Sequence, residues 1–186
     1  SPFALDEVVI SAARWKQEKR DLPVKIVSIT PEDVQLQAPQ TAADLLARSG
    51  EVYVQKSQLG GGSPMIRGFS TNRVMLTVDG VRMNNAIFRG GNLQNVISID
   101  ALSIESSEVI YGPGSVIYGS DALGGVMSFY TLDPRFSSND ELLVKGSALV
   151  RTSSANFEKT GHFDVTFGGK RWASTTSVTY SDYDDL

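Results

Sequence analysis

Residues 104–126 constrain this chain most, because five glycines fall within the fourteen residues from Gly112 to Gly125. Glycine takes positive φ angles at little cost, so such a stretch must bend sharply and pack closely. A strand-like apolar run stops at Gly112-Pro113-Gly114, and a second apolar run follows Gly125. We therefore predict two strands joined by a tight connection, in which Ser115 caps one helical turn. We call residues 104–126 the glycine knot.

Composition excludes several classes of protein. The chain has 186 residues, which corresponds to one domain or a little more. Its formal net charge of −4 argues against a nucleic-acid partner, which calls for a clustered basic surface. The chain has no cysteine, which rules out a disulfide scaffold and thiolate metal sites. No apolar run approaches the roughly 18 residues of a membrane helix.

Four other patterns precede the knot. A short helix with one apolar face is expected over residues 41–46, and Gly50 suits the position just past its end. A triple-glycine loop leads into Ile66-Arg67-Gly68, and an apolar run over residues 74–78 ends in the tight-turn pair Asp79-Gly80. A further helix start is expected at Thr30-Pro31. Strand-like runs alternate with these helices, so we predict a mixed α+β domain.

These motifs and the glycine knot resemble the plug domain of TonB-dependent outer-membrane receptors, in the family's order over residues 41–127. The resemblance implies an α+β fold over residues 22–132, a mixed and mostly four-stranded plug domain with short helices. It implies that the plug fills the lumen of its own barrel in the bacterial outer membrane, with the N-terminus in the periplasm. It also implies a transport receptor without a cofactor.

The N-terminal segment, residues 1–21, contains a β-prone run that begins with acidic residues. One interpretation is a frayed edge strand at a terminus. The other is an extended peptide that adds to the sheet edge of a second protein, with affinity from backbone hydrogen bonds. The run resembles the TonB box of the family, which implies the periplasmic protein TonB as partner. Its residues are Leu5, Asp6, Glu7, Val8, Val9, Ile10 and Ser11.

The resemblance also assigns a latch and a ligand loop. The family commonly has an arginine before the Gly-Pro of the knot, thought to pair with carboxylates of the barrel wall, but this chain has Tyr111 there. Arg67 is retained, so we expect a latch of Arg67 and Tyr111 against the wall. Residues 83–95 are rich in Asn and Gly and form either a plain surface loop or a ligand-contacting loop. In the second case the first contacts are Phe88, Arg89 and Asn92.

Beyond Leu142 the pattern changes to period-two alternation, with Phe163, Val165 and Phe167 on one face and polar residues on the other. A soluble meander shows the same alternation, but the position after a plug favours the first antiparallel strands of a transmembrane β-barrel, over residues 133–186. A plugged barrel has about 22 strands of roughly 10 residues. We therefore expect an incomplete barrel and a piece of a longer protein, whose open strand edges favour self-association.

The sequence contains no complete catalytic motif. The glycine knot lacks the Gly-Lys-Ser/Thr of a phosphate-binding loop, and no Gly-x-Ser-x-Gly elbow is present. His162 is the only histidine, which argues against a catalytic triad and a multi-histidine zinc site. We interpret it as structural or solvated on the lumen face rather than as a ligand. Glu105 and Glu108 are a further acid pair that ordinary ion pairing explains. We predict neither an enzyme nor a metal site.

The expected function is import of a scarce iron complex, haem or a ferric siderophore, with energy delivered by TonB. Within the family, the form of the knot from Gly112 to Gly119 resembles receptors for iron chelates, haem or cobalamin more than glycan importers. Among these, the stretch Asp79-Gly80-Val81-Arg82-Met83-Asn84 favours haem or siderophore import. The predicted plug has no histidine, so an axial haem ligand would come from elsewhere. Two alternatives stay open. One is a cobalamin importer, and the other is an outer-membrane signalling or adhesion receptor that keeps the plug as a scaffold.

Overall fold

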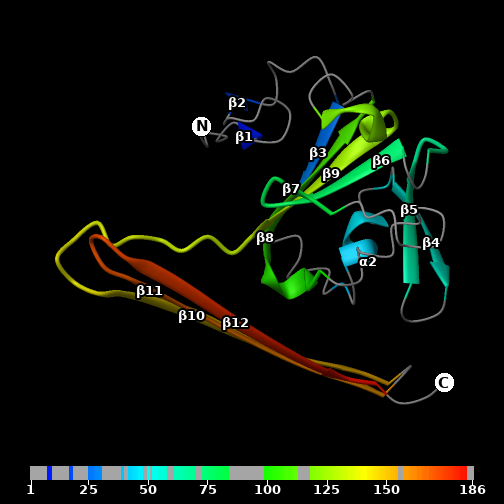
Figure 1. Ribbon diagram of the computed structural model, residues 1–186. Coiled ribbons are helices and arrows are strands. Elements are labelled where there is room, and N and C mark those ends of the chain that lie inside the picture. Colours follow the sequence, from blue (N-terminus) through cyan, green and yellow to red (C-terminus); the bar gives the residue numbers. More distant parts are fainter. Residues whose placement is uncertain are drawn as a thin grey trace, which may run out of the picture. The chain divides into compact units, whose positions relative to one another are not determined.

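The computed structural model describes residues 8–9, 17–18, 25–30, 39, 42–47, 50, 52–57, 61–69, 73–83, 99–112, 118–154 and 157–183. The chain divides into two compact units, Ser1–Thr131 and Leu132–Leu186 (Figure 1). This division falls one residue before the boundary expected from the sequence. The expected helix start at Thr30-Pro31 lies largely outside the described residues, as does Ser115.

The first unit is built on a mixed five-stranded sheet in the order β3-β8-β9-β6-β7. Its strands are β3 (Lys25–Ile29), β6 (Val74–Val78), β7 (Val81–Arg82), β8 (Ile104–Tyr111) and β9 (Gly125–Thr131). β8 is antiparallel to both β3 and β9, whereas β9 is parallel to β6. The predicted α+β class is confirmed. The two-residue strand β7 makes five strands where four were expected, because the Asp79-Gly80 turn folds it back on β6.

A smaller layer covers one face of this sheet. It consists of α2 (Ala42–Ala47) and the hairpin of β4 (Val52–Ser57) and β5 (Gly61–Ile66), which lie close together in Figure 1. Helical spacing places Ala42, Leu45 and Leu46 on one side of α2, where all three are fully buried. They share one core with side chains of the main sheet, namely Val74, Leu76, Val109, Met127 and Phe129. Gly50, at φ 77°, follows the helix as expected.

The opposite face of the main sheet carries a smaller apolar cluster. It contains Ile26, Met75, Ile110 and Val126, with Ala122 from the 3-10 turn η7 (Ser120–Ala122). Another 3-10 turn, η6 (Ala101–Ser103), leads into β8 and is capped by Asp100. Strand alternation explains why the two clusters separate, because successive side chains point to opposite faces.

Two short strands, β1 (Val8–Val9) and β2 (Gln17–Glu18), pair antiparallel near the N-terminus, with Val8 opposite Glu18 and Val9 opposite Gln17.

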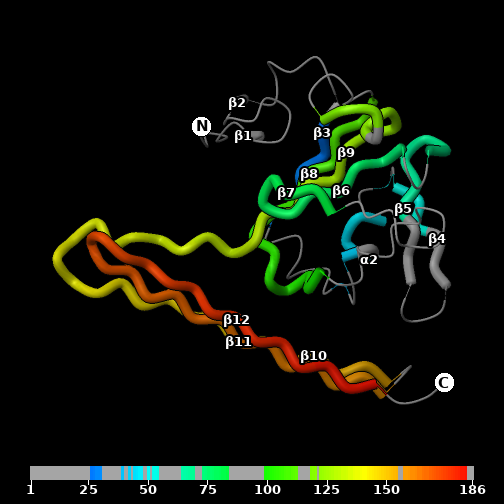
Figure 2. Tube along the Cα trace, viewed as in Figure 1, coloured from blue at the N-terminus to red at the C-terminus, as the bar shows by residue number. Residues whose placement is uncertain are grey.

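The second unit is a three-stranded antiparallel sheet in the order β10-β11-β12. The strands β10 (Leu143–Ser153), β11 (Glu158–Gly168) and β12 (Ala173–Asp182) run side by side over their whole length (Figure 2). Their register gathers the apolar positions on one face and the polar positions on the other, as the alternation predicts. The large apolar side chains are exposed: Val144, Val150, Phe163, Phe167, Val178 and Tyr180.

Within the described part of the chain, no helix has the length and apolar character to span a membrane.

Candidate functional site

The glycine knot brings β8 and β9 into contact at its two ends. Tyr111 lies opposite Gly125 in the antiparallel register, so the chain leaves β8 and returns beside it. Gly125 has φ 153°, and a Cβ there would lie 2.6 Å from the Ile110 carbonyl oxygen. The amide of Gly124 donates to the Arg73 carbonyl at 2.6 Å, which joins the knot to the start of β6. Gly124 and Gly125 therefore form a packed corner of the sheet.

Arg67 and Tyr111, the predicted latch residues, lie close together in the structure. Arg67 and Gly68 have φ values of 49° and 82°, and reciprocal backbone bonds between Ile66 and Phe69 of 2.8 and 2.9 Å close the turn around them. This turn is exposed and places the Arg67 guanidinium over the Tyr111 ring, with Cζ 5.6 Å from the ring centroid. The ring is 3% exposed and belongs to the main core. The geometry is that of a cation–π contact.

Asp79 makes a contact that sequence reasoning missed. The turn residues Asp79 and Gly80 have φ values of 49° and 78°. The Asp79 carboxylate accepts hydrogen bonds from the Thr131 amide at 2.9 Å and from the Thr131 hydroxyl at 2.7 Å. The turn pair was recognisable in the sequence, but its partner lies 52 residues further on and is set by the parallel pairing of β6 with β9.

A row of polar residues crosses the main sheet on the face with the smaller cluster. The register aligns Ser28, Glu108, Ser128 and Thr77 on four neighbouring strands. Thr77 donates to the Ser128 hydroxyl at 3.0 Å, and the Tyr130 hydroxyl donates to Glu108 at 3.4 Å. Glu108, Ser128 and Thr77 are buried. The row explains Glu108 as part of a packed polar band within the sheet.

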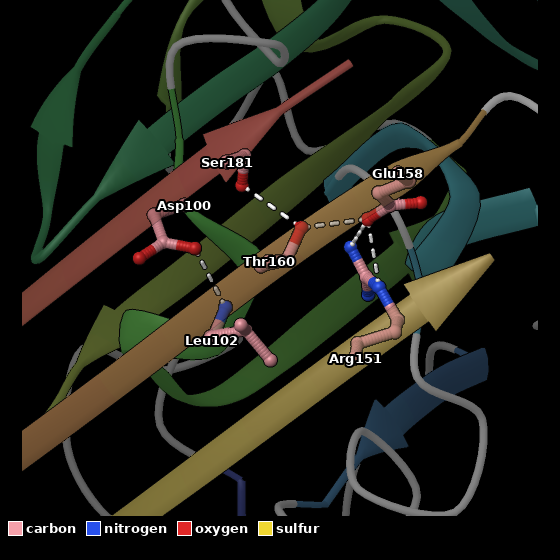
Figure 3. Close-up of polar contacts among 6 residues, drawn as sticks. All are labelled: Asp100, Leu102, Arg151, Glu158, Thr160 and Ser181. Atoms are coloured by element: carbon pink, nitrogen blue, oxygen red, sulfur yellow. Dashed lines mark hydrogen bonds and ion pairs between the residues drawn. The ribbon is translucent and has the colours of Figure 1, made fainter. Parts of the chain in front are cut away.

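The polar face of the second unit contains a buried ion pair. Arg151, on β10, pairs with Glu158, on β11, and its Nε donates to Glu158 Oε1 at 2.8 Å. The Thr160 hydroxyl donates to the same carboxylate at 2.7 Å and accepts from the Ser181 hydroxyl at 3.1 Å (Figure 3). The Glu158 side chain is fully buried, which disfavours its charge, and these donors stabilise that charge. The available sequence signal was the pair of opposite charges, Arg151 and Glu158, on either side of residues 152–157.

His162 lies on the same polar face, where the lumen interpretation placed it. Its Nδ1 is 2.6 Å from the Thr179 hydroxyl and its Nε2 is 3.6 Å from Asp164 Oδ2, while Asp164 also accepts from Ser147. A carboxylate, an imidazole and a hydroxyl thus lie near one another. The pair at 3.6 Å is long for a hydrogen bond. β11 pairs with a strand on each edge, so its backbone amides bond within the sheet. They are therefore not available to stabilise an oxyanion, as a catalytic triad requires.

The other predicted site residues are only partly described. Val8 and Val9 form β1 and pair with β2 of the same chain, whereas Leu5, Asp6, Glu7, Ile10 and Ser11 lie outside the described residues. The ligand-loop residues Phe88, Arg89 and Asn92 lie outside them as well. In the described part of the chain, no group of three or more metal-ligating side chains converges.

A mixed plug-like sheet followed by antiparallel strands with one polar and one exposed apolar face defines the class of plugged outer-membrane receptors. Comparison with known proteins supports the same class. The TonB-dependent Receptor Plug Domain family matches residues 18–126. The chain therefore belongs to that family and to a bacterial outer-membrane receptor.

Individual relatives are receptors and transporters. The vitamin B12 transporter BtuB of Vibrio vulnificus strain CMCP6 is 35% identical over 162 residues, which is 85% of this chain and 26% of that protein. The pyoverdine receptor FpvA of Pseudomonas aeruginosa PAO1 superposes with a TM-score of 0.75 at 18% identity, over 95% of this chain and 24% of FpvA. The alcaligin receptor FauA of Bordetella pertussis superposes with a TM-score of 0.72 at 18% identity, over 96% of this chain and 30% of FauA. The chain thus spans about a quarter of the length of its curated relative.

Proposed function

We propose that this chain is the plug and first barrel strands of an active transporter that imports a scarce complex with energy delivered by TonB. The observation that carries the proposal is the succession of two units in one chain: a sheet of the plug family, then strands with an exposed apolar face and a buried polar network on the other face. The relatives are receptors and transporters, which supports a binding and transport role rather than an enzymatic one.

The substrate we propose first is an iron complex, haem or a ferric siderophore. It rests on the resemblance of the stretch from Asp79 to Asn84 to that branch of the family. The described plug unit supplies no imidazole, because the one histidine of the chain is on β11 in the second unit. An iron complex that brings all of its own ligands therefore suits this chain better than a haem that needs an axial histidine from the plug.

Cobalamin is the second candidate, and one observation favours it. The curated relative with 35% identity over most of this chain is a vitamin B12 transporter. A signalling or adhesion receptor with a rigid plug is the third candidate. Titration of the purified receptor with haem, a ferric siderophore and cobalamin separates the three. Saturable binding of an iron complex supports the first, saturable binding of cobalamin the second, and no binding of any probe contradicts the transport proposal.

For energy transfer we propose the segment from Leu5 to Ser11 as the TonB box. A short extended run adds to a sheet edge through backbone hydrogen bonds, and Val8–Val9 are already extended here. β2 occupies one edge of β1, and a strand has a second edge to which a partner can pair. Binding of the complex outside would make this run accessible to TonB in the periplasm.

For the latch we propose that Arg67 supplies the charge that faces the barrel wall, while Tyr111 holds it in place. The support is the stacking of the exposed guanidinium on a buried ring. For ligand contact we propose the loop that contains Phe88, Arg89 and Asn92, because binding groups commonly sit on loops over a rigid scaffold.

A further inference from the structure

The segment that joins the two units is held by specific contacts at both of its ends. β9 ends at Thr131 and β10 begins at Leu143, so residues 132–142 form the connection, which follows β9 in yellow in Figure 1. The family match ends at residue 126, before this segment. Neither ligand binding nor TonB binding accounts for the contacts at its two ends.

The first contact, which we call the plug-side clamp, is the pairing of Asp79 with Thr131. One carboxylate oxygen of Asp79 accepts from the Thr131 amide at 2.9 Å and the other from the Thr131 hydroxyl at 2.7 Å. The Asp79 amide also donates to the Phe129 carbonyl at 2.9 Å. A turn with two positive φ values accepts Asn or Gly as readily as Asp. The two bonds to Thr131 give the carboxylate a role that the turn alone does not.

The second contact, the barrel-side clamp, lies within the second unit. The Ser137 amide donates to the Gly169 carbonyl in the β11–β12 turn at 3.2 Å. A side chain at Gly168 would overlap the Arg135 carbonyl oxygen, so the segment runs directly over this glycine. The turn is closed by the Gly169 amide, which donates to the Trp172 carbonyl at 2.7 Å. An exposed ion pair between Lys170 and Asp140 joins the same two segments.

Between the clamps only residues 132–134 remain. An extended chain advances at most about 3.3–3.6 Å per residue, so Thr131 and Arg135 cannot be further apart than roughly 14 Å. Pro134 fixes its own φ and drives Asp133 toward an extended conformation. The link is therefore short and stiff, and it can lengthen very little.

We propose that the two clamps and this link form a retention tether, which keeps the last plug strand attached to the β11–β12 turn while the plug is remodelled. The proposal rests on the proposed function, in which TonB acts on the N-terminal side of the plug. β3, the main-sheet strand nearest that side in sequence, is an edge strand, whereas β9 is paired on both sides by β8 and β6. Load from the N-terminus therefore reaches β3 first, and the clamps hold β9 in place.

The barrel-side clamp is tested by Gly168→Ala, with Gly161→Ala as the matched control on the same strand, because a Cβ at Gly161 meets nothing within 4 Å. Both variants are made in the full-length receptor, and trypsin cleavage after Arg135 is timed. We expect cleavage at least about five-fold faster in Gly168→Ala and unchanged in Gly161→Ala, because cleavage follows local opening. Equal rates in wild type and Gly168→Ala would overturn the clamp.

The plug-side clamp is tested by hydrogen exchange at the Thr131 amide. Asp79→Ala removes both acceptors, whereas Asp79→Asn keeps the turn and one acceptor oxygen. Asp100→Ala is the control, because Asp100 also accepts a backbone amide, that of Leu102 at 3.0 Å. We expect Thr131 to exchange about ten-fold faster in Asp79→Ala, much less so in Asp79→Asn, and unchanged in Asp100→Ala. Unchanged exchange in Asp79→Ala contradicts the clamp.

Retention itself is tested with the double variant Asp79→Cys/Thr131→Cys, which introduces a cysteine pair into a chain that has none. Uptake of haem, a ferric siderophore and cyanocobalamin is compared in oxidised and reduced cells. We expect oxidised cells to import the bound probe as wild type does, because the clamp stays closed throughout. Loss of uptake on oxidation, restored by dithiothreitol, overturns the tether. If wild type imports none of the probes, the proposed function fails, and the cleavage and exchange experiments still decide the clamps.

Discussion

Gly125 shows why the knot needs glycine at particular positions. Its φ of 153° is rarely adopted by residues with a side chain, and a Cβ would lie 2.6 Å from the Ile110 oxygen and 2.9 Å from Ile66 Cδ1. Gly112 also has a positive φ, of 103°, but a Cβ there meets nothing within 4 Å. A side chain at Gly125 would therefore meet both backbone strain and steric overlap, whereas a side chain at Gly112 would meet backbone strain alone.

We expect Gly125→Ala to lower the free energy of unfolding by about 2–4 kcal/mol, because strain and overlap add. Gly112→Ala carries strain alone and should cost only about 1–2 kcal/mol. Urea unfolding of the purified variants measures both. Equal losses in the two variants would show that close packing at Gly125 contributes nothing.

The contact between Arg67 and Tyr111 has a measurable coupling energy. An exposed cation over an aromatic ring contributes about 0.5–1 kcal/mol. A double-mutant cycle of Arg67→Ala and Tyr111→Leu isolates this pair from the other contacts of either residue. We expect a coupling in that range from urea unfolding. Strictly additive losses would remove the positioning role proposed for Tyr111.

At the scale of elements, the strands β10, β11 and β12 show how a period-two pattern becomes two different surfaces. The same register that exposes Val178 on one face places Thr179 against His162 on the other. The polar face satisfies its own groups, since Glu158 is buried among Arg151 and Thr160. The large apolar side chains on the other face of these strands are exposed. An exposed apolar surface of this kind suits contact with the lipid of a bilayer.

We expect Val178→Lys to destabilise the receptor in lipid vesicles by roughly 2–4 kcal/mol, the cost of a lysine near the bilayer midplane. Val178 is at the middle of β12 and 61% exposed. Ser174→Lys, on the same face near the strand end, should cost at most about 1 kcal/mol. Folding titrations in vesicles give both values. Similar costs at the two positions would mean that this face does not contact lipid.

Local patterns were readable from the sequence, and long-range register was not. The short helix at Leu45, the Asp79-Gly80 turn and the alternating faces around Phe163 depend on neighbouring residues, and the structure confirms them. The bonds from Asp79 to Thr131 depend on which strands pair. The Thr179 contact of His162 likewise depends on the β11–β12 register, which the turn fixes. Neither of these two contacts could be derived from the spacing of residues in the sequence alone.

At the scale of the whole molecule, the chain combines a family plug with strands suited to a membrane, joined by the tether. The arrangement gives the two ends of the plug different roles. The N-terminal run from Leu5 to Ser11 is proposed to receive the force from TonB. The C-terminal strand β9 is proposed to stay with the barrel.

We propose that TonB drives this receptor through that N-terminal run. The direct measurement is TonB binding and substrate uptake by the full-length receptor with Val9→Pro, which removes a backbone donor and fixes φ. Ala13→Pro, outside the run, is the control. We expect Val9→Pro to abolish TonB binding and uptake while substrate binding persists, and Ala13→Pro to leave all three intact. Unchanged TonB binding by Val9→Pro would contradict this role of the N-terminal run.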